Sequence, residues 1–182
     1  MKKIIKIPLI IIGILFLAYL AGFLLPRKVQ VERTAIINAS PEAVYSLINN
    51  LTTYDKWMPW NQLDPTWKVE YATQKVGAGA WYKWDSKNSS VGKGKLTIDQ
   101  SIPNEKIITK LEFEGFSEPS MGGFLLKPAG NGTEVKWYME SDMGNNPGYR
   151  WMGLMMNKLL GAQFEKGLQN IEALAGKSEL KR

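Results

Sequence analysis

The side chains that this chain offers for chemistry are restricted by its composition. Its 182 residues include no cysteine and no histidine. Disulfides, zinc sites of the Cys/His kind and Ser-His or Cys-His nucleophiles are therefore excluded. The glycine patterns at 77–79 and 92–94 lack the strand-to-helix setting that a nucleotide fingerprint requires. We expect no metal site and no cofactor, and any acid–base chemistry falls to carboxylates, lysines or tyrosines.

Carboxylates are the first candidates for such chemistry, and their positions argue against it. Glu112 and Glu114 share one face of a predicted strand, as do Glu140 and Asp142. Both pairs lie opposite the apolar face of their strand, so a solvated outer face is the simpler interpretation. Asp64 belongs to an Asp-Pro pair, which is common in turns. We therefore assign no catalytic residue.

Aromatic residues point instead to binding. Tyr82 and Trp84 share the apolar face of one strand, where Tyr82 suits either a core position or a hydrogen bond to a ligand carbonyl. The stretch WMPWNQLDP, residues 57–65, holds two further tryptophans around a proline. Trp57 ends a helical turn and is expected in the core. Trp60 follows the proline that stops the helix and is expected at the rim of a binding site.

Hydrophobic periodicity predicts the elements that position these residues. Ser40 has the chemistry of a helix N-cap, with Pro41 at the first helical position. The pair Asn131-Gly132 signals a tight hairpin. One strand, two short helices, six strands and a long helix are predicted, at 28–38, 41–50, 51–57, 67–71, 76–86, 91–101, 106–116, 120–127, 133–141 and 147–176.

This order of elements predicts an α+β domain, in which one antiparallel sheet packs against segregated helices. The long helix carries an apolar stripe with a period near that of an α-helix. The stripe comprises Met152, Met155, Met156, Leu159, Leu160, Phe164, Leu168, Ile171 and Leu174. A curved sheet wrapped around this helix leaves an apolar hollow between the two.

The first 28 residues form a separate segment. Lys2, Lys3 and Lys6 precede an uncharged run from Ile7 to Leu25. At about 1.5 Å per residue this run is close to the thickness of a bilayer core. We expect an uncleaved single-pass membrane anchor, with a cleaved signal peptide as the alternative. The excess of lysines before the run favours a domain on the extracytoplasmic side.

The charge of the chain is concentrated in the same segment. Residues 1–28 hold five of the 23 basic residues and none of the 17 acidic ones. The remainder is almost balanced, so the net charge of +6 does not indicate a surface for nucleic acid. We expect the membrane, through the N-terminal helix, as a partner and no nucleic acid.

The sequence also resembles a known group of proteins. The strand VERTAIINAS leading into PEAVYSLI, then YDKWMPW, KVGAGAWYKW, the hairpin NGTEVKW and the closing helix from Pro147 resemble the START-like (SRPBCC) superfamily. They are most similar to its bacterial polyketide cyclase/dehydrase-like branch, including membrane-anchored members. The resemblance implies a helix-grip fold with a hydrophobic cavity over residues 29–176, following an anchor at 1–28 and followed by a polar tail at 177–182.

These observations predict a membrane-anchored domain that binds a hydrophobic small molecule or lipid between sheet and helix. One alternative is a polyketide cyclase or dehydratase-type enzyme acting on an aromatic or polyketide-like substrate. A second is an envelope interaction module without a ligand. The residues predicted to contact the ligand are Trp60, Tyr82, Trp84, Phe113, Trp137, Met139, Met152, Met155, Met156 and Leu159.

Overall fold

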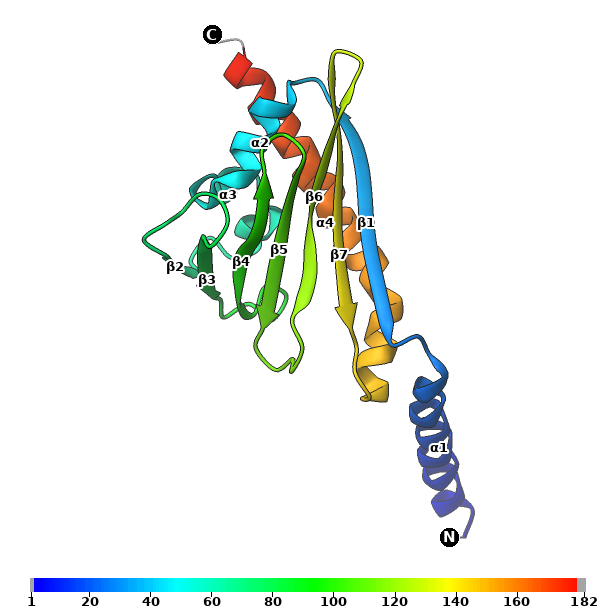
Figure 1. The fold of residues 1–182 in the computed structure, drawn as a ribbon. Coiled ribbons are helices and arrows are strands. Elements are labelled where there is room, and N and C mark those ends of the chain that lie inside the picture. The colour runs from blue at the N-terminus through cyan, green and yellow to red at the C-terminus, as the bar shows by residue number, and fades with distance from the viewer. Residues whose placement is uncertain (1, 180–182) are drawn as a thin grey trace.

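A computed structural model describes residues 2–179, with side chains described for residues 7–176. Figure 1 shows a sheet lying along one long helix, with a second helix projecting from one end of the domain. The helical elements are α1 (Lys2–Ala21), η1 (Gly22–Leu24), α2 (Pro41–Asn49), η2 (Leu51–Thr53), α3 (Tyr54–Trp57), η3 (Pro59–Gln62) and α4 (Pro147–Glu179). The strands are β1 (Lys28–Ile37), β2 (Lys68–Tyr71), β3 (Trp81–Asp85), β4 (Lys93–Ile102), β5 (Lys106–Phe113), β6 (Ser120–Ala129) and β7 (Gly132–Asp142).

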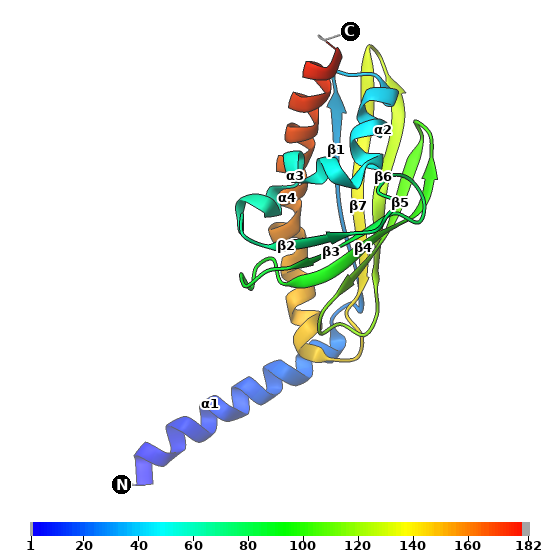
Figure 2. The same ribbon diagram turned by 90° about the vertical axis from the view of Figure 1, so that its left-hand side faces the viewer.

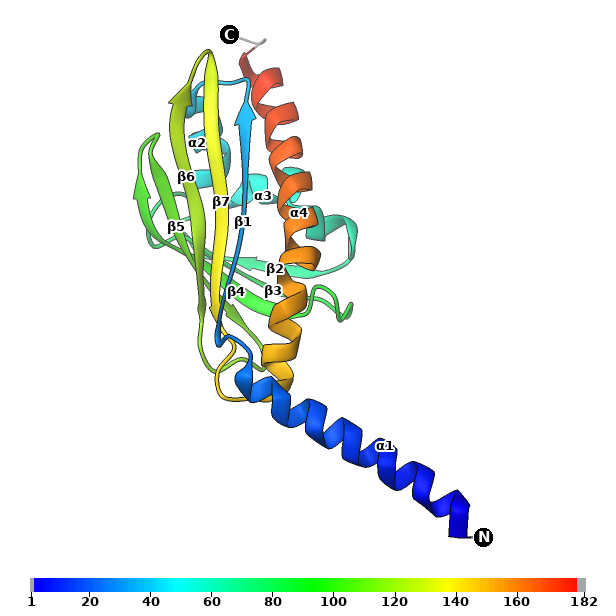
Figure 3. The same ribbon diagram turned by 90° about the vertical axis from the view of Figure 1, so that its right-hand side faces the viewer.

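The seven strands form one antiparallel sheet in the order β1-β7-β6-β5-β4-β3-β2. Figures 2 and 3 show the sheet curving around α4, with α2 and α3 on the same side of the sheet. A register shift at Ile98/Gln100 interrupts the pairing of β4 with β5, and such irregularities bend a sheet. The α+β helix-grip fold predicted from the sequence is confirmed.

Glycine permits a close approach of two strands next to this bend. Gly123 has a φ of 152°, and a Cβ built there would lie 2.1 Å from the carbonyl oxygen of Ile107 on β5. Every other residue type would collide with that oxygen. The Gly122-Gly123 pair in β6 therefore serves the shape of the sheet.

Most predicted local features are present. The Ser40 side chain accepts a hydrogen bond from the amide of Ala43, which caps α2. The β6–β7 turn lies one residue earlier than the sequence indicated. Ala129 pairs with Gly132, so Gly130 and Asn131 form the loop, and Gly130 has the positive φ of 58°.

The long helix also ends later than predicted. It continues past Gly176 to Glu179, and residues 180–182 of the predicted polar tail lie outside the described residues. Its inner face buries Phe164, Leu168 and Ile171 against the sheet and α2.

Helix α1 is, among the described residues, the one helix long and apolar enough to cross a membrane. Its window Ile7–Leu24 has a mean hydropathy of 2.6 and is 6% buried. Both a membrane span and a signal sequence have this composition. The end of α1 and the η1 turn that follows it are joined to α4. Trp151 Nε1 donates to the carbonyl of Ala18 in α1 at 2.9 Å, and Arg150 Nη1 donates to that of Phe23 in η1 at 2.7 Å.

Candidate functional site: an apolar cavity beneath the long helix

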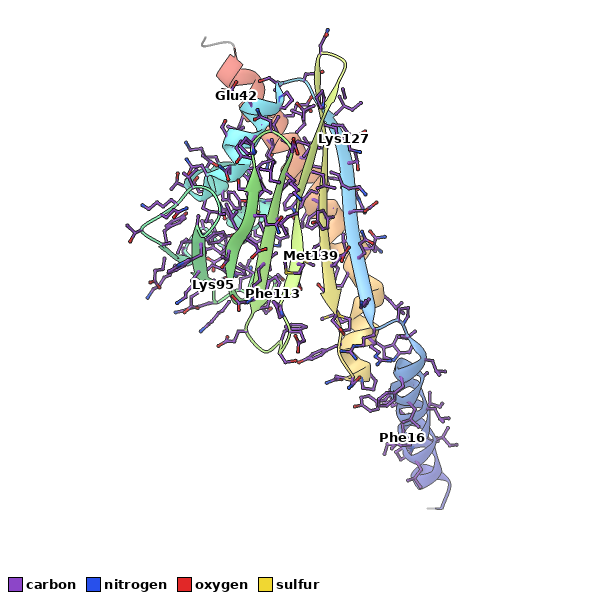
Figure 4. All side chains as sticks on the ribbon, in the orientation of Figure 1. Phe16, Glu42, Lys95, Phe113, Lys127 and Met139 are labelled. Carbon is purple, nitrogen blue, oxygen red and sulfur yellow. The ribbon has the colours of Figure 1, made fainter. Side chains whose placement is uncertain are left out.

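A cavity of about 150 Å³ lies between the concave face of the sheet and α4. Figure 4 marks two of its residues, Phe113 on β5 and Met139 on β7, within the domain and away from the projecting α1. Its lining is almost entirely aromatic and aliphatic. The lining residues are Tyr54, Met58, Trp60, Trp67, Tyr82, Trp84, Ser90, Val91, Leu96, Thr109, Leu111, Phe113, Phe124, Trp137, Tyr138, Met139, Leu160 and Phe164.

Stacked aromatic rings form the wall between sheet and helix. Trp137 of β7 stacks on Phe164 of α4, with ring centroids 4.2 Å apart and planes 7° apart. The other side of Trp137 approaches Phe124 at 4.9 Å. Trp57 and Trp60 meet Trp137 edge-on, at 5.6 and 6.1 Å. Such contacts fix the orientation of each ring, so this wall of the cavity is rigid.

A second aromatic group lines the opposite part of the cavity. Tyr82 and Trp84 project from β3 with ring centroids 5.6 Å apart, and Trp84 meets Phe113 edge-on at the same distance. Gly94 makes room for this arrangement, because a Cβ there would lie 2.5 Å from the Trp84 ring. Trp84 Nε1 is satisfied by the carbonyl of Val91, so its ring offers the cavity an apolar surface.

Hydroxyl groups supply the polar part of the lining. Tyr82 and Thr109 are buried and form no side-chain hydrogen bond within the described part of the chain. The hydroxyl of Tyr54 is fully buried and has no partner there. Burial, reinforced by charge repulsion from neighbouring tyrosines, raises the pKa of both Tyr54 and Tyr82 above the usual tyrosine value. At neutral pH these hydroxyls are uncharged donors.

The two tryptophans of the 57–65 stretch occupy different positions, as predicted. Trp57 is 0% exposed and packs against Phe124 and Trp137 in the core. Its carbonyl accepts a hydrogen bond from Asn170 of α4. Trp60 is only partly buried, contacts Phe164 and lines the cavity.

The lining residues that reach solvent mark the mouth of the cavity. They are Ser90 in the β3–β4 loop, which is exposed, and Trp60, Trp67, Leu111, Phe113, Tyr138 and Leu160, which are partly exposed. Polar contacts hold this rim in place, among them a hydrogen bond from Asn88 to the carbonyl of Leu63. Asp64 accepts hydrogen bonds from Ser86 and Thr66, which lower its pKa, and so ties the β3–β4 loop to the turn after η3. Asp64 therefore acts as a turn residue, consistent with the sequence interpretation.

Six of the ten predicted ligand contacts line this cavity: Trp60, Tyr82, Trp84, Phe113, Trp137 and Met139. The other four, all on α4, do not. Met152 and Met156 are partly buried, and Met156 packs against the core, whereas Met155 and Leu159 are exposed on the outside of the helix. The prediction that these two face the hollow is wrong. At 100° per residue, Leu159 and Met155 are turned about 100° and 140° from the inward-facing Leu160.

The sequence interpretation missed other residues of the lining. On α4 the contacts come from Leu160 and Phe164, which belong to the predicted stripe but were not chosen as contacts. On β5, Thr109 and Leu111 share the alternation that identified Phe113. Because Thr109, Leu111 and Phe113 are two residues apart, their side chains lie on the same face of β5. The choice of Phe113 as a ligand contact should therefore have included Thr109 and Leu111.

The carboxylate pairs lie outside the cavity, as expected. Glu112 pairs with Lys110 at 3.1 Å, and Asp142 pairs with Arg27 at 2.6 Å. Within the described residues, no carboxylate, lysine or arginine belongs to the cavity lining. The same residues contain no group of three or more His, Cys, Asp or Glu arranged to hold a metal ion.

Solved structures share this fold. The di-domain ARO/CYC protein StfQ from the steffimycin biosynthetic pathway matches with a TM-score of 0.66 and 12% identity, over 84% of this chain and 52% of that one. A protein of unknown function from Staphylococcus aureus, SA2116, matches with a TM-score of 0.62 and 16% identity, over 84% and 96%. Protein NE0264 from Nitrosomonas europaea matches with a TM-score of 0.59 and 10% identity, over 84% and 97%. These likenesses concern the fold alone.

Sequence comparison gives the family. No curated protein matches the chain. The profile of the family described as polyketide cyclase/dehydrase and lipid transport matches residues 28–176, which include every strand and most of α4. The matched segment contains all eighteen residues that line the cavity. The chain therefore belongs to the polyketide cyclase/dehydrase and lipid transport family.

Proposed function

We propose that this protein is a membrane-anchored binding domain for a small, neutral, hydrophobic molecule. One observation carries the proposal: an apolar cavity, open at one mouth, that side chains leave unfilled. Native cores are close-packed and hold few voids larger than a water molecule. A cavity of about 150 Å³ walled by rigid aromatic rings is therefore expected to serve a ligand.

The lining indicates the chemistry of this ligand. A charged ligand would lose its hydration and find no opposite charge among the described lining residues, which costs several kcal/mol. The hydroxyls of Tyr82 and Thr109 suit a single oxygen on an otherwise apolar molecule. An apolar cavity of about 150 Å³ accommodates a molecule the size of benzene. The ligand, or the part of it that enters, is thus one ring or a short acyl segment.

A cyclase or dehydratase acting on an aromatic or polyketide-like substrate is the alternative that the family name favours. Catalysis of this kind needs a group that accepts or donates a proton. The ionisable groups of the lining are tyrosines, and burial raises the pKa of Tyr54 and Tyr82. At neutral pH these hydroxyls stay protonated and cannot act as bases, and a raised pKa also weakens them as acids, which favours binding over turnover.

We further propose that α1 is an uncleaved anchor and that the domain lies on the extracytoplasmic side. The contacts of α1 and η1 with α4 support an anchor, because a segment destined for removal needs no such contacts. Gly22 packs so closely that a Cβ there would lie 2.7 Å from that of Pro147. The orientation rests on the basic residues that precede the span. The nearly balanced charge of residues 29–182 supports a domain that does not bind nucleic acid.

Native mass spectrometry of the full chain, released from the membrane of its host, tests both parts of the proposal. The mass of the polypeptide reports whether residues 1–28 remain. A bound small molecule is expected on the wild-type chain and not on Leu111→Trp, which fills the cavity. Lys127→Trp, which places the same side chain on the exposed surface of β6, is the matched control. Wild-type protein that carries no small molecule would contradict the binding function.

A further inference from the structure

The first half of α4 exposes apolar side chains on the side that faces away from the sheet. Trp151, Leu154, Met155 and Leu159 are 42%, 55%, 57% and 54% exposed. At 100° per residue they fall within an arc of about 140°, and they extend about 12 Å along the helix. We call these four residues the outer arc. Single exposed apolar residues are ordinary, but a contiguous group marks an interaction surface.

The same side of the helix changes character further along. Gln169 lies five full turns after Trp151 and is exposed, and Glu165 and Lys166 are its exposed neighbours on that side. The second half of α4 therefore has the polar outer face of a helix at the surface of a soluble domain. The partner of the outer arc must be confined to the end of α4 from which α1 departs.

Contacts with α1 show where the first half of α4 lies relative to the apolar span. Trp151 donates a hydrogen bond to the carbonyl of Ala18, which lies six residues before Leu24, the last residue of the apolar window. The hydrogen bond from Arg150 to the carbonyl of Phe23 fixes the same junction. Figures 2 and 3 show α1 leaving the domain obliquely, on the side of the sheet where α4 lies. A bilayer that contains α1 must therefore approach the outer arc.

We propose that the outer arc lies in the headgroup region of the bilayer that holds α1, so that the first half of α4 is a membrane-contacting surface. Tryptophan is enriched at this depth, and methionine and leucine suit the acyl boundary. Lys158, exposed between Leu154 and Leu159 on the same side, extends its ammonium towards lipid phosphates. This inference rests on the proposed anchor.

The position of the outer arc relative to the cavity gives it a function. Leu159 precedes Leu160, which lies at the mouth of the cavity, and Met156 packs against the core one turn before. A continuous row of apolar side chains on α4 thus runs from Trp151, which contacts the end of α1, to the mouth of the cavity. A hydrophobic ligand that passes between bilayer and cavity along this path avoids full exposure to water.

The absence of cysteine from the chain makes the proposal directly testable. Met155→Cys, Leu159→Cys, Gln169→Cys and Leu15→Cys are each introduced into the full chain, spin-labelled, and reconstituted in vesicles of equal parts phosphatidylcholine and phosphatidylglycerol. Collision with oxygen, which partitions into lipid, is compared with collision with a water-soluble nickel chelate. The oxygen-to-nickel ratio at positions 155 and 159 is expected to be several-fold higher than at 169 and lower than at 15, which lies near the middle of the apolar span.

Each other outcome has a defined meaning. A ratio at 155 and 159 equal to that at 169 would overturn the proposal, because the outer arc would then face water. Protection of 155 and 159 from both reagents would also overturn it, since another protein or a second copy of the chain would cover the arc. A water-accessible label at position 15 would refute the anchor itself. Ligand binding is measured separately, so its failure leaves these ratios unaffected.

A functional measurement separates the outer arc from the cavity. The double variant Met155→Glu/Leu159→Glu is expected to slow the uptake of 4-fluorophenol from vesicles several-fold. Its equilibrium affinity for the same probe in detergent is expected to equal that of the wild type, because neither side chain lines the cavity. Uptake from vesicles at the wild-type rate would contradict the role of the arc as a path.

Discussion

The two halves of α4 form one continuous helix but have different surroundings. From Gly161 to Ala175 the helix buries one apolar face and presents charged or polar residues outward. From Pro147 to Leu160 it carries apolar residues on both its inner and outer sides. The comparison teaches that an apolar stripe in a helix identifies a contact surface and does not identify the partner. In the second half that partner is the sheet, and in the first half we propose a membrane as well.

The two halves of α4 also contribute differently to the cavity. Phe164, in the second half, supplies a rigid wall through its stack on Trp137. Leu160, at the end of the first half, supplies the partly exposed mouth. Stability is therefore expected to depend on the second half of the helix, and ligand access on the first. Substitutions that separate these two properties test the comparison.

The largest expected effect is that of Phe164→Ala. Removing a buried ring that stacks on Trp137 is expected to lower the free energy of unfolding by about 3–5 kcal/mol. Leu159→Ala, on the exposed side five residues earlier, is the matched control and is expected to change it by less than about 0.5 kcal/mol in detergent. Urea unfolding followed by tryptophan fluorescence measures both. Equal losses would remove the distinction between the halves.

The comparison extends to the two tryptophans that pack beside α4. Trp57→Ala is expected to cost about 3–5 kcal/mol, because Trp57 is fully buried and its backbone is held by Asn170. Trp60→Ala removes a partly exposed rim residue and is expected to cost less, while it changes the affinity for ligand. The free energy of unfolding and the affinity for ligand are measured for each variant. If both lost the same stability and binding were unchanged, Trp60 would not be a rim residue.

Two glycines, one within the second half of α4 and one directly after it, offer a finer test. A Cβ at Gly167 would lie 2.4 Å from the Trp137 ring, so Gly167→Ala is expected to destabilise by about 1–3 kcal/mol despite the better helix propensity of alanine. Gly176 has open space around it, and Gly176→Ala is expected to stabilise by up to about 1 kcal/mol. Thermal unfolding of the two variants should shift in opposite directions. A stabilising Gly167→Ala would show that α4 does not press on Trp137.

The smallest expected effect concerns the exposed junction near the start of α4. A hydrogen bond from Arg27, with a second from the Gly144 amide, lowers the pKa of Asp142. A lowered folded-state pKa contributes stability that is present above the usual aspartate pKa and is lost as pH falls through the folded value. Asp142→Asn should therefore lose a little stability near neutral pH and show a weaker decline below pH of about 4. Parallel pH–stability curves for wild type and variant would contradict this assignment.

Strand periodicity was sufficient to predict much of the site. Side chains alternate along a strand, so Tyr82 must share a face with Trp84, and Trp137 with Met139. Because the opposite face of each strand is polar, the face with these residues is the inner one. The orientation of α4 was not predictable in the same way. Residues 151–160 are apolar on more than one side, so the pattern does not distinguish Met155 from Leu160. That choice is made by tertiary contacts, such as the stack of Trp137 on Phe164.

The central claim is that the cavity beneath α4 binds a small neutral hydrophobic molecule. Fluorine-19 NMR of 4-fluorophenol, titrated into the full chain in nanodiscs with empty nanodiscs as blank, tests it most directly. With about eight heavy atoms in the probe, a dissociation constant on the order of 0.1–1 mM is expected. We predict binding to the wild type and to Lys127→Trp, none to Leu111→Trp, and no binding of the anion 4-fluorobenzoate. Equal binding of 4-fluorophenol to wild type and Leu111→Trp, or none to either, would contradict the claim.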